Sequence, residues 1–272
     1  MNQSNKIVLY CKSFRDDVNR CKMLMDSIQE YNSDKIPVYV SVPQADVSLF
    51  KATLKGDYKV VSDEEINKND NLFNRGISPR ILAFSTRMNI WMTGIADNYL
   101  CLDSDGYFIK SFKVTDFMYD DTTPYTVCHE QKELFYWTVR NDVGYDPYQY
   151  FVNERTSIKN IIGTGGKPLD FGPNPVVWNA KLLQHFNENY LKPNNLTTED
   201  VISYSSDEYT WVGEYLIATQ LYKLIPSEPF FRVYHYKKQY DDDKSMGVTL
   251  EHIAKNYFGI ILQSAQGMPL KY

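Results

Sequence analysis

Residues 6–105 alternate short apolar runs with longer segments of helical spacing, and this order strongly limits the folds open to the chain. The apolar runs suited to strands are Lys6–Tyr10, Val38–Val42, Tyr58–Val61 and Tyr99–Leu102. The segments with apolar residues three or four apart, as in helices, are 17–31, 46–54 and 79–94. Strands that alternate with helices predict a mostly parallel sheet covered by helices, so we expect an α/β, Rossmann-like fold.

The second half of the chain has a less regular pattern. The strands predicted there are 125–128 and 175–178, and the predicted helices are 180–189 and 208–222. Residues 163–175 form a glycine- and proline-rich segment, GTGGKPLDFGPNP, and long loops of this kind in compact domains are often functional. Because no linker or repeat interrupts the 272 residues, we expect a single domain.

Charge and cysteine usage exclude some classes of protein. The formal net charge is −5 and 23% of the residues are charged, whereas a nucleic-acid binder carries a basic stripe. The cysteines show no C-x-x-C spacing and resemble small buried apolar residues of a reducing compartment; they are Cys11, Cys21, Cys101 and Cys128. The N-terminus lacks the layout of a signal peptide and no apolar run is long enough to span a bilayer. We therefore expect a cytoplasmic protein that does not bind nucleic acid.

Two aspartates follow the last apolar run of the first half. The stretch YLCLDSDG places Asp103 and Asp105 at the carboxyl end of a predicted parallel strand. Ligands of open α/β sheets bind in the crevice outside that end of the strands. Carboxylate oxygens suit Mg²⁺ or Mn²⁺, which share their remaining positions with waters and phosphates. The pair therefore predicts a divalent-cation site that receives a diphosphate.

Other readings of the same stretch remain open. An apolar run followed by Asp-x-Asp-Gly also begins phosphatases of the haloacid dehalogenase type, in which Asp103 would be the nucleophile. Those proteins usually carry Thr or Val after the glycine, and this chain has Tyr107. The two aspartates could also simply cap a turn before a hairpin.

Six segments occur in an order that resembles a known family. They are CKSFRDDVNRCKMLMDSI, VYVSVPQADVSLF, VVSDEEI, the DSD strand, PNPVVWNAKLLQHF and SSDEYTWVGEYL. Together they resemble a GT-A-fold nucleotide-sugar glycosyltransferase, and more specifically a bacterial family of capsule and O-antigen gene clusters. The resemblance extends from Lys6 to His235, and it implies a nucleotide-binding half at 1–110 and an acceptor-side half at 111–272.

The resemblance implies transfer of a sugar from a nucleoside diphosphate sugar to a hydroxyl of a capsule, O-antigen or lipopolysaccharide glycan. Mn²⁺ or Mg²⁺ would be held by Asp103 and Asp105, with Ser104 beside the nucleotide sugar. A late histidine, His235, would be a further metal ligand, with Lys237 near the diphosphate. A lone histidine is also often structural.

The acceptor of such an enzyme is expected to be lipid-linked, so we expect peripheral attachment to the inner face of the membrane. The apolar segment 252–272 is the candidate for that contact. A last helix packed on the core is the alternative for this segment.

Further candidates for the nucleotide-sugar site follow the other predicted strands. Ser13 and Arg15 come after the first strand and Asp63 after the third, so they should reach the same edge of the sheet. Arg80 opens a helix after a proline and could bind a diphosphate with two parallel hydrogen bonds. Ordinary turn chemistry explains Ser13 and Asp63 equally well, and a solvated helix terminus explains Arg80.

Asp207 and Glu208 begin the last long predicted helix. Asp207 suits the N-cap, where the helix dipole favours a negative charge. The related proteins carry Ser-Glu-Tyr here, so only Glu208 and Tyr209 match them. We expect Glu208, with Asp207 beside it, to supply the catalytic carboxylate that accepts the proton of the acceptor hydroxyl in an inverting transfer. In a retaining enzyme this carboxylate would orient a substrate, and a glycan-binding protein without catalysis is the remaining alternative.

Overall fold

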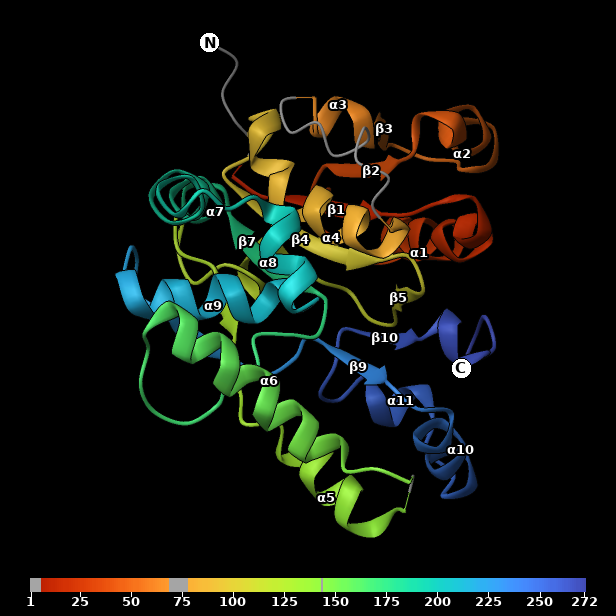
Figure 1. Ribbon diagram of the computed structural model, residues 1–272. Coiled ribbons are helices and arrows are strands. Elements are labelled where there is room, and N and C mark those ends of the chain that lie inside the picture. The colour runs from red at the N-terminus through yellow and green to blue at the C-terminus, as the bar shows by residue number, and fades with distance from the viewer. Residues whose placement is uncertain (1–5, 69–77, 143) are drawn as a thin grey trace.

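The computed structural model describes residues 6–68, 78–142 and 144–272. A five-stranded sheet lies in one part of the molecule, and a helical pair and a smaller sheet lie beside it (Figure 1).

The five-stranded sheet confirms the predicted α/β class. Its strands, in spatial order, are β3 (Lys59–Ser62), β2 (Val38–Val42), β1 (Val8–Lys12), β4 (Asn98–Asp103) and β7 (Val176–Asn179). The first four run parallel, and β7 pairs antiparallel with β4. The sheet is therefore mostly parallel, as its continuous apolar strands predict.

Helices connect the parallel strands, as predicted. They are α1 (Val18–Tyr31), α2 (Val47–Thr53), α3 (Asp63–Ile66) and α4 (Pro79–Asn89). Short 3-10 turns precede two of these helices: Arg15–Asp17 precedes α1 and Gln44–Asp46 precedes α2. A third 3-10 turn, Ile90–Thr93, continues α4. Ser78 caps α4 by accepting from the backbone N–H of Ile81.

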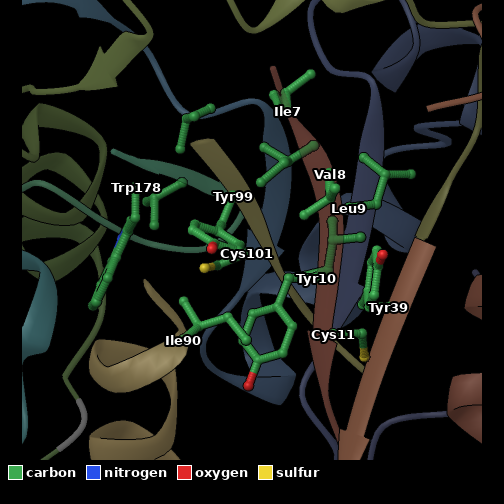
Figure 2. Close-up of a cluster of buried hydrophobic side chains, with 14 of the residues drawn as sticks. Ile7, Val8, Leu9, Tyr10, Cys11, Tyr39, Ile90, Tyr99, Cys101 and Trp178 are labelled. Atoms are coloured by element: carbon green, nitrogen blue, oxygen red, sulfur yellow. The ribbon is translucent and has the colours of Figure 1, made fainter. Parts of the chain in front are cut away.

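The core lies on the central strands of this sheet. Leu9, Tyr10 and Leu100 are fully buried, because strands covered on both faces expose no side chain to water. Figure 2 shows Tyr10 and Cys101 among these side chains. The Tyr10 hydroxyl is hydrogen-bonded to Ser41 Oγ at 2.7 Å, which satisfies both buried hydroxyls.

A second, three-stranded sheet contains the C-terminal segment. Its order is β5 (Gly106–Phe108), β10 (Gly259–Leu262) and β9 (Phe231–Tyr234). All four residues of β10 are buried, and β10 pairs antiparallel with β5 and parallel with β9. This burial argues against the segment 252–272 as a membrane contact and agrees with packing on the core, although the buried element is a central strand and the expected one was a helix.

The remaining elements belong mainly to the second half. A separate parallel pair is formed by β6 (Tyr125–Val127) and β8 (Ile225–Ser227). The helices are α5 (Lys132–Arg140), α6 (Pro147–Ile162), α7 (Ala180–Phe186), α8 (Thr198–Tyr204), α9 (Glu208–Thr219), α10 (Lys237–Ser245) and α11 (Leu250–Ile253). Shorter turns are the 3-10 segments Val114–Asp116, Lys192–Asn194 and Ser264–Gln266 and the π-helical segment Asn187–Leu191. No helix in the described ranges has both the length and the apolarity needed to cross a bilayer.

Candidate functional site

A pocket of about 220 Å³ lies where β1 and β4 end. The register of the two parallel strands sets Lys12 beside Asp103, so the residues that follow each strand meet at one edge of the sheet. The predicted candidates that line the pocket are Ser13, Asp103, Ser104 and Asp105. Arg87 and Asp17 line it as well. The sequence thus correctly predicted that polar groups gather at this edge.

Asp103 is held by two donors on one of its oxygens. Arg87 Nη1 and Asn174 Nδ2 each donate to Asp103 Oδ1 over 2.8 Å. The Asp103 side chain is 33% exposed, so its carboxylate still faces the pocket. Because Arg87 comes from α4 and Asn174 from the loop before β7, two distant segments fix this one carboxylate.

Arg87 also binds Glu208, the first residue of α9. Its Nη2 donates to Glu208 Oε1 in the buried interior. Burial raises the pKa of Glu208 to about 7, and the opposing charge of Arg87 limits that rise. Glu208 is fully buried and lies behind Arg87, outside the pocket lining. This burial argues against the direct proton transfer predicted for Glu208, since a base must reach its substrate.

Asp105 points into the pocket from the turn after β4. Its Oδ2 accepts from the backbone N–H of Ser264 over 2.9 Å. Burial, and after it the neighbouring charge of Asp103, raises the pKa of Asp105 to about 7. Ser104 Oγ donates to Asp17 Oδ2 over 3.3 Å, so Asp17 adds a third carboxylate to the lining.

The two aspartates fit the predicted divalent cation in part. The charge of Asp103 contributes to the raised pKa of Asp105, and a cation between the two carboxylates would remove that repulsion. Mg²⁺ commonly uses one or two carboxylates and completes its shell with waters and substrate phosphates. Within 6–68, 78–142 and 144–272, no three His, Cys, Asp or Glu side chains are grouped to hold a metal. The two aspartates at the pocket match the one or two carboxylates that Mg²⁺ commonly uses.

His235 does not join the aspartates in one ligand set. It lines a neighbouring cavity of about 320 Å³, and burial lowers the pKa of its imidazole to about 4. Gln263, which lines the aspartate pocket, lies between them, with its Nε2 3.4 Å from His235 Nδ1. The imidazole is thus neutral near pH 7 and connected to the pocket through one amide.

The two cavities adjoin. Pro173 and Val233 line both, and Pro173 belongs to the glycine- and proline-rich loop. The larger cavity is further lined by His129, Arg232, Gln239 and the glutamates Glu130, Glu133 and Glu228. Together they form a polar depression that extends from the end of the sheet toward α5.

Ser13 differs from the other candidates that follow the first and third strands. Its hydroxyl is buried at the pocket and has no hydrogen-bond partner among the described residues. Asp63 is fully buried. Its Oδ2 lies 3.0 Å from Lys12 Nζ, so the carboxylate balances the buried charge of the lysine. Arg15 turns away and binds Asp46, with Nη2 2.7 Å from Oδ1. Only Ser13 of the three reaches the pocket lining.

The two predicted diphosphate cations, Arg80 and Lys237, lie elsewhere. Arg80 is exposed and its guanidinium sits 5.5 Å from the Phe84 ring centre. Lys237 pairs with Asp241 at 2.7 Å on the surface of α10. Arg87, two turns after Arg80 on α4, is the arginine that lines the pocket.

Asp207 has a structural role at the start of α9. It accepts from the Thr210 backbone N–H over 3.2 Å and the Thr210 hydroxyl over 2.7 Å, as an N-cap does. Its Oδ2 is also 2.7 Å from Arg155 Nη2, and Arg155 binds Asp170 at 3.0 Å. Burial raises the pKa of Asp207 to about 6. The N-cap prediction is confirmed, and this ion-pair cluster accounts for the carboxylate without a catalytic role.

Sequence reasoning missed Arg87, Asn174 and Asp17. Arg87 had a signal, because an arginine in a predicted core helix must bury its charge and requires an acidic partner. Asn174 lies in the loop already noted for its length. Asp17 begins the helix predicted over 17–31, and no local pattern distinguishes a helix start from a residue that lines a pocket.

A family model described as a family of unknown function, DUF6492, matches residues 6–143, just over half of the 272 residues. The match includes Ser13, Arg87, Asp103 and Asp105 and ends before Asn174 and Glu208. A comparison with curated proteins finds no match to the chain. The chain belongs to this family of unknown function, DUF6492.

Proposed function

We propose that the chain is a metal-dependent glycosyltransferase of GT-A type that uses a nucleoside diphosphate sugar. The observation that carries the proposal is the pocket at the ends of β1 and β4, where Asp103 and Asp105 lie beside the buried arginine Arg87. Carboxylates and a fixed guanidinium in one small pocket suit a ligand that brings both a cation and phosphate groups.

Asp103 and Asp105 would hold Mn²⁺ or Mg²⁺ together with the donor. When bound, the cation would neutralise the negative charge that develops on the departing diphosphate. The unpartnered Ser13 hydroxyl and the Arg87 guanidinium would donate to the phosphate oxygens. Asn174 would keep Asp103 oriented by donating to Asp103 Oδ1, the same oxygen that accepts from Arg87.

The acceptor would enter through the larger cavity beside the donor pocket. Amide, imidazole and carboxylate groups line that cavity, and such groups recognise sugar hydroxyls by paired hydrogen bonds. We propose a lipid-linked surface glycan as the acceptor and a cytoplasmic site of action. Glu208 would act as a positioning residue that fixes Arg87.

The test is nucleotide release from a panel of nucleoside diphosphate sugars, with Mn²⁺ and with EDTA. Asp105→Asn should abolish the release that depends on Mn²⁺, and the exposed Asp57→Asn is the matched control that should not. Release by the wild-type chain that ignores EDTA and persists in Asp105→Asn would contradict the proposal.

The two alternatives predict positive results in two other assays. A phosphatase of the haloacid dehalogenase type would hydrolyse a generic phosphomonoester and lose that activity in Asp103→Asn. A glycan-binding protein would release no nucleotide and bind its glycan equally well in EDTA.

A further inference from the structure

Phe14 exposes an aromatic ring at the donor pocket, the pocket of about 220 Å³ at the ends of β1 and β4. It follows Ser13 directly after β1, lines the pocket and is 44% exposed. Among the described residues that line this pocket, Phe14 is the single aromatic one. None of the ring-to-ring contacts within 6–68, 78–142 and 144–272 involves it. The ring is therefore open to a ligand in the pocket.

Hydrogen bonds fix the backbone on both sides of Phe14. The N–H of Ser13 donates to Ser41 O over 2.9 Å and continues the pairing of β1 with β2. The N–H of Arg15 donates to Asp46 Oδ2 over 3.0 Å, and Arg15 Nε donates to Oδ1 of the same buried carboxylate over 2.8 Å. The segment that carries the ring is thus ordered before any ligand binds, which lowers the entropy cost of packing a ligand on it.

The donor pocket is too small for a whole nucleoside diphosphate. Its volume is about 220 Å³, whereas sites that enclose small-molecule ligands measure roughly 300 to 1,000 Å³. Asp103, Asp105 and Arg87 take up its polar lining and suit the cation and the phosphates. Part of the ligand must therefore extend beyond these groups.

Two directions lead out of the polar lining. One passes Pro173 and Val233 into the larger cavity, which the acceptor would occupy. The other passes Phe14, which lines the donor pocket and does not line the larger cavity. A planar base and an exposed aromatic ring bury apolar surface against each other when they stack. The side of Phe14 is thus the one that suits the base.

We propose that Phe14 is the platform on which the base of the nucleoside diphosphate stacks. This inference rests on the proposed donor and adds the residue that recognises its base. Every base has a π-face, and a phenyl ring has no hydrogen-bonding group, so the stack adds affinity for any base. Phe14 therefore distinguishes a nucleoside diphosphate from a diphosphate that lacks a base.

Ribose 5-diphosphate is the matched probe, because it contains the ribose and the diphosphate of the ligand and lacks only the base. Titration calorimetry in Mn²⁺ compares it with the diphosphates of uridine, cytidine, adenosine and guanosine. We expect the wild type to bind the best of these four more tightly than the probe. Phe14→Ala should weaken binding of that nucleoside diphosphate roughly 5- to 100-fold, and should change the affinity for ribose 5-diphosphate by less than about twofold.

A matched control removes a similar ring elsewhere. Phe135 on α5 is 40% exposed and does not line the donor pocket, so Phe135→Ala should leave the affinities for both ligands unchanged. Phe14→Trp keeps a flat aromatic surface and should retain binding. Its added indole fluorescence should be quenched by the nucleoside diphosphate and not by ribose 5-diphosphate.

The outcomes separate this inference from the proposed function. Equal weakening of both ligands in Phe14→Ala, or a loss no larger than in Phe135→Ala, would overturn the role of Phe14 and leave the proposed donor in place. Absence of quenching in a Phe14→Trp variant that binds the nucleoside diphosphate would overturn it too, whatever the stability of Phe14→Ala. A wild-type chain that binds none of the four nucleoside diphosphates in Mn²⁺ would contradict the proposed function and this inference together.

Discussion

Arg87 Nη1 donates to Asp103 Oδ1 over 2.8 Å, and this contact connects the buried interior of the protein to the pocket at the sheet edge. The other end of the same guanidinium binds Glu208. A buried arginine with two carboxylate partners is fixed in place, because leaving either charge unpaired in the interior would be costly. Arg87 is thus a rigid donor at the pocket rather than a mobile surface cation.

Replacing Glu208 by Gln should disturb the pocket through Arg87. The variant removes the charge that holds the guanidinium, so we expect a higher KM for the donor together with a lower kcat. The matched control is Glu214→Gln, another buried glutamate, which pairs with Lys159 at 3.1 Å away from the pocket. Steady-state kinetics on both variants measure the effect.

A different result in these kinetics would support Glu208 as the general base. A loss of kcat by roughly 10² to 10⁴ with unchanged donor affinity is what removal of a general base produces. Inversion at the anomeric carbon, observed by NMR, would accompany it.

Arg87→Lys should lower donor affinity although it keeps the positive charge. An ammonium group cannot reproduce the planar fork that reaches Asp103 and Glu208 at once. Arg80→Lys, on the exposed face of the same helix, is the control and should bind the donor like the wild type. Titration calorimetry with Mn²⁺ and the preferred nucleoside diphosphate measures both. Equal affinities in the two variants would remove Arg87 from the donor site.

Asp207→Asn should destabilise the fold without changing turnover of the folded enzyme. The amide retains part of the N-cap, but the ion pair with Arg155 is lost. Arg155 keeps Asp170 as a partner, so we expect a cost of about 1 to 3 kcal/mol in the free energy of unfolding. Urea denaturation gives that value. A large loss of kcat with unchanged stability would show that Asp207 has a catalytic role after all.

His235 should make the protein less stable in mild acid. Its folded pKa of about 4 lies below the value of about 6.5 expected when it is unfolded. The unfolded chain therefore binds more protons between these pH values, and the stability that depends on the neutral imidazole is lost as the pH falls from about 6.5 to about 4. The charged and titratable groups around it are Asp170, Arg232, Arg155 and His129.

The variant His235→Gln isolates this contribution. Its Tm should fall less than that of the wild type between pH 7 and pH 5, whereas the exposed His252→Gln should behave like the wild type. The raised pKa values of Asp105 and Glu208 act in the opposite direction in all three proteins and cancel in the comparison. Identical pH profiles for wild type and His235→Gln would contradict the account.

Much of the fold follows from local pattern, and the site does so only in part. Strands such as Val38–Val42 are continuous apolar runs, so their position is visible in the sequence. Helix α5 was not predicted because it has only nine residues, too few for the three- to four-residue spacing of its apolar side chains to distinguish a helix from a strand. The aspartates were found because they end a strand. Asn174 was not, because its contact with Asp103 depends on how a loop returns to the sheet.

The most direct test of the pocket assignment is the Tm of the wild type and Asp105→Asn with nucleoside diphosphates, in Mn²⁺ and in EDTA. We predict that at least one nucleoside diphosphate raises the Tm of the wild type in Mn²⁺, that EDTA removes the rise, and that Asp105→Asn shows none. A wild-type Tm that no nucleoside diphosphate changes in Mn²⁺, or an equal rise in Asp105→Asn, would contradict the account.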